Sequence, residues 1–295
     1  MKHFFYYIIT FTIAFAMTSC YEDYIKDNEV TAAYFSSQKP LRTVISDRDM
    51  NIKVGVAIGG KREVDMNDWA EFEIDPELLD GTNLVLLPDN YYTLSDPKKM
   101  KVSRPTLAVA DVTINFTDKF YEDANSTKTY YALPFKVTNS SLSQITEGKS
   151  TSIVAIKYIS NYHGYYYIQG KINSLNDDGS IKETAEYNNI NLSQNDTRLV
   201  STLSRTEVSR QGIANREIKD DEHVKLTFKN NGEIEVIVEG NNITSVEGNG
   251  SYKEVDGRLQ LTLNYKFKKG ADTFSVEETL TRRQDPLKDL RFEEW

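Results

Sequence analysis

Hydrophobic and polar residues alternate through the C-terminal half of the chain. Between 224 and 239, apolar residues occupy every second position on both sides of Asn231-Gly232. A period of two indicates a half-buried β-strand, and Asn-Gly between two such runs is a strong hairpin signal. The same pattern follows Asp256-Gly257 from 259 to 267, and a further strand is expected from Asp272. These segments predict successive β-hairpins.

The number of strands predicts how this half is closed. Strands are also expected at 165–172, 181–192 and 198–204, which gives seven or eight strands between 162 and 283. One face of each strand is polar, so the sheet should be antiparallel with one face in water. A meander of this size must close or cover its edges. We therefore expect an antiparallel calycin-like or lipocalin-like β-barrel, or a tight sandwich.

The N-terminal half has shorter apolar runs separated by polar turns. One helical turn is expected at 76–80, with Asp75 as N-cap. Eight short strands suggest an immunoglobulin-like β-sandwich over residues 30–159. The barrel domain then covers residues 160–295, and the fold class is all-β with two domains. The eight expected strands are 31–35, 41–45, 50–58, 69–74, 100–102, 108–116, 130–138 and 152–159.

The first residues have the layout of a secretory signal. Lys2 precedes an apolar run, Phe4 to Ala16, that is too short to span a bilayer. Cys20 follows this run and is the single cysteine, so no intramolecular disulfide can form. The arrangement resembles a bacterial lipoprotein cleavage site, which implies a removed signal peptide at 1–19 and lipidation of Cys20, with anchoring in the outer-membrane lipid. The alternative is an ordinary signal peptide with an incidental cysteine.

Residues 20–29 form an acidic stretch. Glu22, Asp23, Asp27 and Glu29 lie within it, and such a run usually is a solvated tether. In Bacteroidetes-type lipoproteins an acidic stretch at this place resembles the signal for export to the outer face of the outer membrane. We therefore expect a lipid-anchored protein that faces the cell surface, with a periplasm-facing location as the alternative.

Composition and charge indicate a globular protein and make nucleic acid an unexpected partner. The chain has 39% hydrophobic and 27% charged residues, which is typical of a globular protein. It carries 35 Lys+Arg against 44 Asp+Glu, a net charge of -9, so we expect no nucleic acid as a partner.

Catalytic and metal-binding patterns are weak. Beyond the signal, the chain has only two histidines, His163 and His223, and it contains neither a Gly-x-Ser-x-Gly elbow nor a His-Glu-x-x-His motif. We therefore assign no catalytic residue, metal or cofactor. An acid pair for glycoside hydrolysis stays open, because carboxylate separations are invisible in a sequence. Glu277 and Glu278 are adjacent on a strand and should face opposite sides of the sheet.

Aromatic side chains are the main candidates for a binding site. The chain has 18 Tyr, 13 Phe and 2 Trp. Alternation from 165 places Tyr165, Tyr167 and Gln169 on the polar face of one strand, where phenol rings can stack on sugar rings. Packing between the domains is the alternative for this cluster. Trp69 and Trp295 are further candidates for exposed sugar platforms.

Two segments carry a family resemblance. The chain reads Leu-Pro-Asp-Asn-Tyr-Tyr-Thr-Leu at 87–94 and Tyr-Tyr-Ala-Leu-Pro-Phe-Lys-Val at 130–137. In this order behind a lipoprotein signal, they resemble the N-terminal domain of Bacteroidetes surface lipoproteins of polysaccharide-utilisation systems, over about residues 30–159. The remainder is similar, more loosely, to the lipocalin-like second domain of that family. The resemblance implies a surface location beside a glycan importer, and it implies no catalytic residue set.

These observations lead to one expected function and two alternatives. We expect a non-catalytic surface lipoprotein that binds a polysaccharide or oligosaccharide for a starch-utilisation-like uptake system, with the neighbouring importer as a partner. A glycoside hydrolase with an acid pair in the C-terminal domain is one alternative. A structural or adhesive surface protein is the other.

Overall fold

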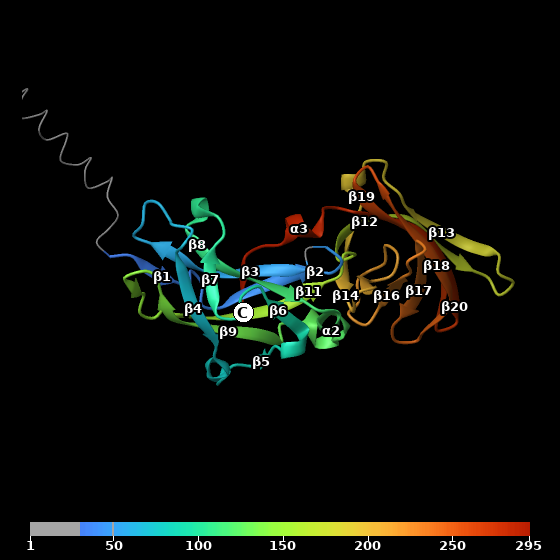
Figure 1. The fold of residues 1–295 in the computed structure, drawn as a ribbon. Helices are drawn as coiled ribbons and strands as arrows, with labels where there is room; N and C mark the ends of the chain where they lie inside the picture. Colours follow the sequence, from blue (N-terminus) through green and yellow to red (C-terminus); the bar gives the residue numbers. More distant parts are fainter. Residues whose placement is uncertain (1–29, 49) are drawn as a thin grey trace, which may run out of the picture.

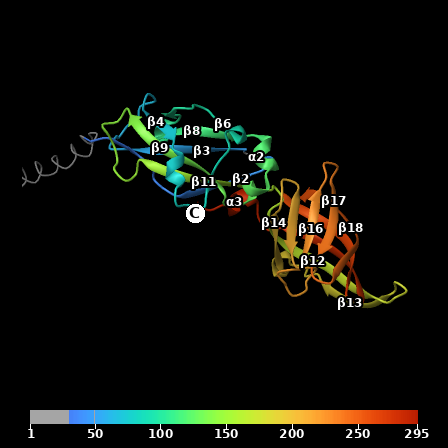
Figure 2. The ribbon, with the colours of Figure 1, turned by 90° about the horizontal axis from the view of Figure 1, so that it is seen from below.

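The structure, a computed structural model, describes residues 30–48 and 50–295. They form two β-rich bodies that lie end to end (Figures 1 and 2). The predicted signal peptide, Cys20 and the acidic tether lie outside the described residues. Within 30–48 and 50–295, no helix is long and apolar enough to cross a membrane.

The first body is one hydrogen-bonded sheet that folds over on itself as a sandwich. Its strand order is β10-β1-β3-β8-β7-β4-β9-β11-β2-β21, and β5 and β6 pair with β9 and β8. Its strands are β1 (Ala32–Tyr34), β2 (Pro40–Ile45), β3 (Asn51–Gly59), β4 (Trp69–Ile74), β5 (Val85–Leu86), β6 (Tyr92–Leu94), β7 (Lys99–Val102), β8 (Val109–Phe116), β9 (Tyr131–Ser140), β10 (Gln144–Ile145), β11 (Thr151–Ile159) and β21 (Glu293–Glu294). Its short helices are η1 (Pro76–Leu79), η2 (Asp89–Tyr91), η3 (Pro105–Leu107), α2 (Asp118–Glu122), η4 (Ala124–Thr127) and α3 (Pro286–Asp289).

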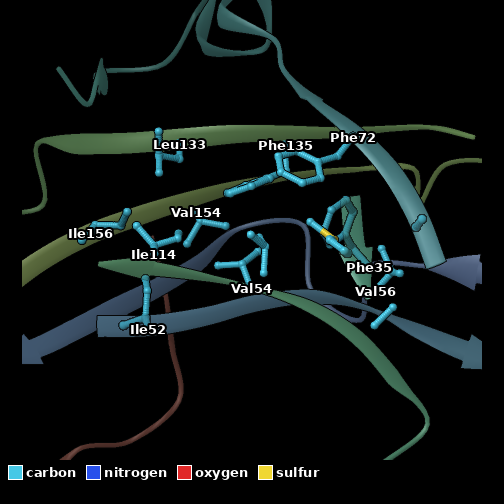
Figure 3. Close-up of a cluster of buried hydrophobic side chains, with 14 of the residues drawn as sticks. Phe35, Ile52, Val54, Val56, Phe72, Ile114, Leu133, Phe135, Val154 and Ile156 are labelled. Atoms are coloured by element: carbon cyan, nitrogen blue, oxygen red, sulfur yellow. The ribbon is translucent and has the colours of Figure 1, made fainter. Parts of the chain in front are cut away.

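The core of the sandwich lies between its two halves. Val54 and Ile114 come from β3 and β8, and Leu133 and Ile156 come from β9 and β11; all four side chains belong to one buried cluster (Figure 3). Every second residue of β3 is buried, as alternation predicts. Burial of these alternate side chains holds the two halves together.

The second body is a closed antiparallel barrel. Eight strands follow the cycle β12-β14-β15-β16-β17-β18-β19-β20, and β20 pairs with β12 to close it. β13 pairs with the far half of β12. The strands are β12 (Gly164–Leu175), β13 (Ile181–Tyr187), β14 (Thr197–Thr202), β15 (Glu207–Gln211), β16 (His223–Phe228), β17 (Glu233–Glu239), β18 (Ile243–Val255), β19 (Arg258–Lys269) and β20 (Asp272–Arg282), and η5 (Leu192–Gln194) precedes β14.

The C-terminal strap, residues 284–295, leaves the barrel and returns to the first body. Its strand β21 pairs with β2, so the last residues extend the first sheet. Asp285 accepts two hydrogen bonds from Arg48, at 2.8 and 2.9 Å. The chain therefore crosses between the bodies twice, once near residue 160 and once at the strap.

The expected fold class is confirmed, with local differences. Asp75 caps η1 by accepting from the Glu77 N–H, as the sequence predicted. The expected strand at 181–192 ends earlier, at Tyr187, because the chain turns into an asparagine-rich loop. Strand β15 was not predicted, because its inward position 210 is an arginine and its hydrophobic alternation is therefore incomplete.

Candidate functional site

The outer face of the barrel carries a regular grid of polar side chains. It is built by β12, β20 and β19, whose outward positions lie opposite one another in three rows. We call this grid, with the loop beside it, the outer groove. Row by row, its residues are Tyr167, Thr281 and Gln260; Gln169, Thr279 and Thr262; and Lys171, Glu277 and Asn264.

Two hollows of the surface follow this grid. The first has a volume of about 560 Å³ and lies over the second and third rows. The second has a volume of about 650 Å³ and lies over the first row. Gln169 and Gln260 line both hollows, so the two adjoin. Positions 167 to 171 span about 14 Å of extended strand, which is longer than one sugar ring.

The loop between β13 and η5 forms one wall of the outer groove. The Asn195 amide donates to the carbonyls of Asn189, Asn191 and Leu192, at 2.9 to 3.2 Å. The Gln169 amide, on the floor, donates to the Asn189 carbonyl at 2.8 Å. This bonding fixes the loop, and the loop holds Ile190 fully exposed beside Tyr167.

The charges that line the groove nearly balance. Lys171 and Glu277 form an ion pair at 3.1 Å, and amides and hydroxyls make up most of the remaining grid. Glu186, Asp256 and Arg258 also line the two hollows. Neutral donors and acceptors beside an aromatic ring suit the hydroxyls and the C–H faces of an uncharged sugar.

The strand positions between the grid residues point into the barrel. Glu278 is there, beneath the groove, and its carboxylate accepts from Tyr187, Tyr265 and Arg210 at 2.9 to 3.1 Å. Burial, reinforced by the charge of Glu278, raises the pKa of both tyrosines, so both phenols keep their protons and donate. Glu277 and Glu278 thus face opposite sides of the barrel wall, and they do not form an acid pair for one sugar.

Tyr165, predicted to bind with Tyr167, lies elsewhere. It is 43% exposed and lines a cavity of about 270 Å³ at the junction of the two bodies, together with Lys157 of β11. The guanidinium of Arg283 lies 5.3 Å from the centre of its ring. The junction, not the outer groove, is therefore the environment of Tyr165.

The two tryptophans lie on the first body, far from the barrel grid in the fold. The Lys99 ammonium lies 4.3 Å from the centre of the Trp69 ring on β4. The indole N–H of Trp295 donates to the Ile153 carbonyl at 2.7 Å, which fastens the end of the chain. Of the five predicted glycan-binding residues, only Tyr167 and Gln169 therefore line the outer groove.

Most residues of the grid were not predicted as site residues. Thr262, Thr279 and Gln260 are alternate polar residues on strands that it predicted, so their outward direction was visible. The pairing of β12 with β20 was not visible, and this pairing sets their rows beside Tyr167. Among residues 30–48 and 50–295, no cluster of His, Cys, Asp and Glu is arranged to hold a metal ion.

Comparisons with known proteins support the architecture. A family model for an N-terminal domain matches residues 21–144. A Bacteroides ovatus protein of unknown function aligns with a TM-score of 0.73 at 20% identity, over 88% of this chain and 95% of that one. This similarity shows that the two-body fold occurs in another chain.

A second structure is less similar. A Bacteroides thetaiotaomicron chain described as an auxiliary nutrient binding protein aligns with a TM-score of 0.43 at 14% identity, over 87% of this chain and 96% of that one. None of the curated proteins compared with the chain matches it significantly.

Proposed function

We propose that the protein is a non-catalytic, lipid-anchored surface protein that binds a polysaccharide in the outer groove of its barrel. The observation that carries the proposal is the three-by-three grid of Tyr167, Gln169 and their neighbours on β19 and β20. A row of amides and hydroxyls along a hollow longer than one ring can follow a chain of sugars. Each contact is weak, and a repeating polymer compensates by multivalency.

The composition of the grid supports an uncharged glycan. Its one cation, Lys171, is already paired with Glu277. The three rows therefore offer an anionic sugar no free cation, and Arg258 beside them lines the same hollow as Asp256. Tyr167 would stack on a sugar face, and Thr262 and Thr279 would exchange hydrogen bonds with sugar hydroxyls.

The sequence supports the proposed location. The apolar leader, Cys20 and the acidic stretch after it support an outer-membrane anchor that faces outward, with a glycan importer as neighbour. Labelling of cells with radioactive palmitate should mark the protein, and the variant Cys20→Ala should lose the label. Protease added to whole cells should digest the anchored protein; full protection would contradict the surface location.

The binding proposal is tested by affinity electrophoresis of residues 21–295 in gels with different neutral polysaccharides. We expect retardation in at least one gel and its loss in Tyr167→Ala. Tyr165→Ala is the matched control, because it removes the same ring from the same strand at the junction. Equal losses in both variants would place binding outside the outer groove, and no retardation in any gel would refute the glycan proposal.

A further inference from the structure

The first body also has a hollow, and it is chemically unlike the outer groove of the barrel. It has a volume of about 590 Å³ and lies between β2, the start of β3 and the C-terminal strap. Figure 1 shows α3 of the strap beside β2 and β3. This volume is in the range of small-molecule sites. We call it the strap cavity.

About half of the residues that line the strap cavity are apolar, and two of them are unusually exposed. Phe292 and Leu287 of the strap are 68% and 55% exposed, although both line the cavity. Val44 and Ile52 of the sandwich core form the opposite wall. An apolar ligand would cover side chains that water now contacts, and this burial favours binding.

The charge of the strap cavity is one-sided. Arg42, Arg48, Lys53 and Arg291 line it, and none of its described lining residues is acidic, in a chain of net charge -9. Arg48 forms an ion pair with Asp285, and Lys53 forms one with Asp111. Within the described part of the chain, Arg42 and Arg291 have no carboxylate partner, and Arg291 donates only to the backbone carbonyls of Lys288 and Leu290.

Arg42 is placed to meet a ligand. Strand alternation puts it on the same face of β2 as Val44, which is 2% exposed in the core. Arg42 is partly buried and lines the strap cavity, where a cation without a counter-charge is costly.

We propose that the strap cavity binds a small amphiphilic organic anion, with a carboxylate at Arg42 and Arg291 and an apolar body against Phe292 and Leu287. Charge complementarity selects the anionic head, and the apolar walls select the tail. The site is separate from the outer groove, so the two proposals can fail independently.

The test is calorimetric titration of residues 21–295 with decanoate below its micelle concentration. Decyl tetraethylene glycol ether and decyltrimethylammonium carry the same tail on a neutral head without sugar and on a cationic head. We expect decanoate to bind at least about fivefold more tightly than either, because charge-assisted hydrogen bonds are stronger than neutral ones. Equal affinity for the decyl tetraethylene glycol ether would overturn the proposal.

Variants locate the site. Arg42→Gln and Phe292→Ser should each weaken decanoate binding about fivefold or more. Arg104→Gln is the matched control, since it removes the same charge from an exposed position away from the cavity. Equal affinities for decanoate in Arg42→Gln and Arg104→Gln would show that Arg42 only shields a sheet edge.

A vesicle experiment separates a free ligand from a membrane. If the protein bound phosphatidylglycerol vesicles but not free decanoate, its partner would be a membrane surface, and this result would also refute the proposal. Glycan retardation should be unchanged in Arg42→Gln.

Discussion

The Arg210 guanidinium donates to the Glu278 carboxylate at 3.1 Å inside the barrel, and neither side chain is exposed. Arg210 also donates to the carbonyls of Gly212 and Ala214, both at 2.6 Å. The buried ion pair thus connects β15 to β20, whose outer face carries part of the groove, and Arg210 also bonds the loop that follows β15.

Loss of this carboxylate should destabilise the barrel. Glu278→Gln leaves Arg210 buried without a counter-charge, and we expect the free energy of unfolding to fall by about 3 kcal/mol. Urea unfolding measures it. Glu277→Gln is the matched control on the same strand, and it should cost less than about 1 kcal/mol because its ion pair is exposed. Equal costs would contradict the buried role of Glu278.

The junction between the bodies should depend on Arg205. Its guanidinium reaches across from the barrel to Asp47 and Asp118 of the first body and lies 5.6 Å from the centre of the Tyr121 ring. These groups are partly exposed, so Arg205→Ala should cost about 1 kcal/mol or less. The larger effect should be on domain orientation, seen as a broader distance distribution in small-angle scattering. Arg104→Ala should leave the distribution unchanged; broadening in both variants would contradict the assignment.

Stability at low pH should depend on Asp68. Burial by itself would raise the pKa of this carboxyl, but hydrogen bonds from Lys61, the Asp65 N–H and Ser141 outweigh it and hold the pKa below 3.8. Because the folded pKa is depressed, the stabilisation is present above the unfolded value and is lost as the pH falls through the folded value. At neutral pH, Asp68→Asn should cost about 2 kcal/mol.

Urea unfolding at a series of pH values checks this prediction. The difference in free energy of unfolding between the protein and Asp68→Asn should be constant from pH 7 to about 5 and should shrink below 3.8, where the carboxyl of the unfolded chain is protonated. A difference that stayed constant down to pH 2 would rule out Asp68 as the source.

The loop beside the outer groove should loosen without Gln169. Its amide bonds the Asn189 carbonyl and the Asn188 side chain, at 2.8 and 3.3 Å. Gln169→Ala should speed amide hydrogen exchange over 188–195 and weaken glycan binding about two- to tenfold, the range expected for one or two hydrogen bonds. The Gln260 amide donates to the Thr281 hydroxyl and not to the loop. Gln260→Ala should therefore change glycan binding without changing amide hydrogen exchange over 188–195. Unchanged exchange in Gln169→Ala would show that Gln169 does not hold the loop.

The sequence by itself determined the local structure of this protein. Alternation of apolar residues located most strands within one or two residues, and Asp75 and Asn231-Gly232 marked a cap and a turn. These signals succeed because the side-chain direction of a strand and the geometry of a turn depend on neighbouring residues only.

The tertiary structure decided the partners of each strand and therefore the site. Pairing of β12 with β20 closes the barrel and places Gln169 beside Thr279, although the two are far apart in the chain. The same long-range packing puts Glu278 and Arg210 at inward positions, where alternation alone predicts apolar residues, because each supplies the other's counter-charge. It also returns Trp295 to the first body, where the Ile153 carbonyl accepts its indole N–H. None of these relationships is encoded in a local pattern, since each depends on which distant surfaces pack together.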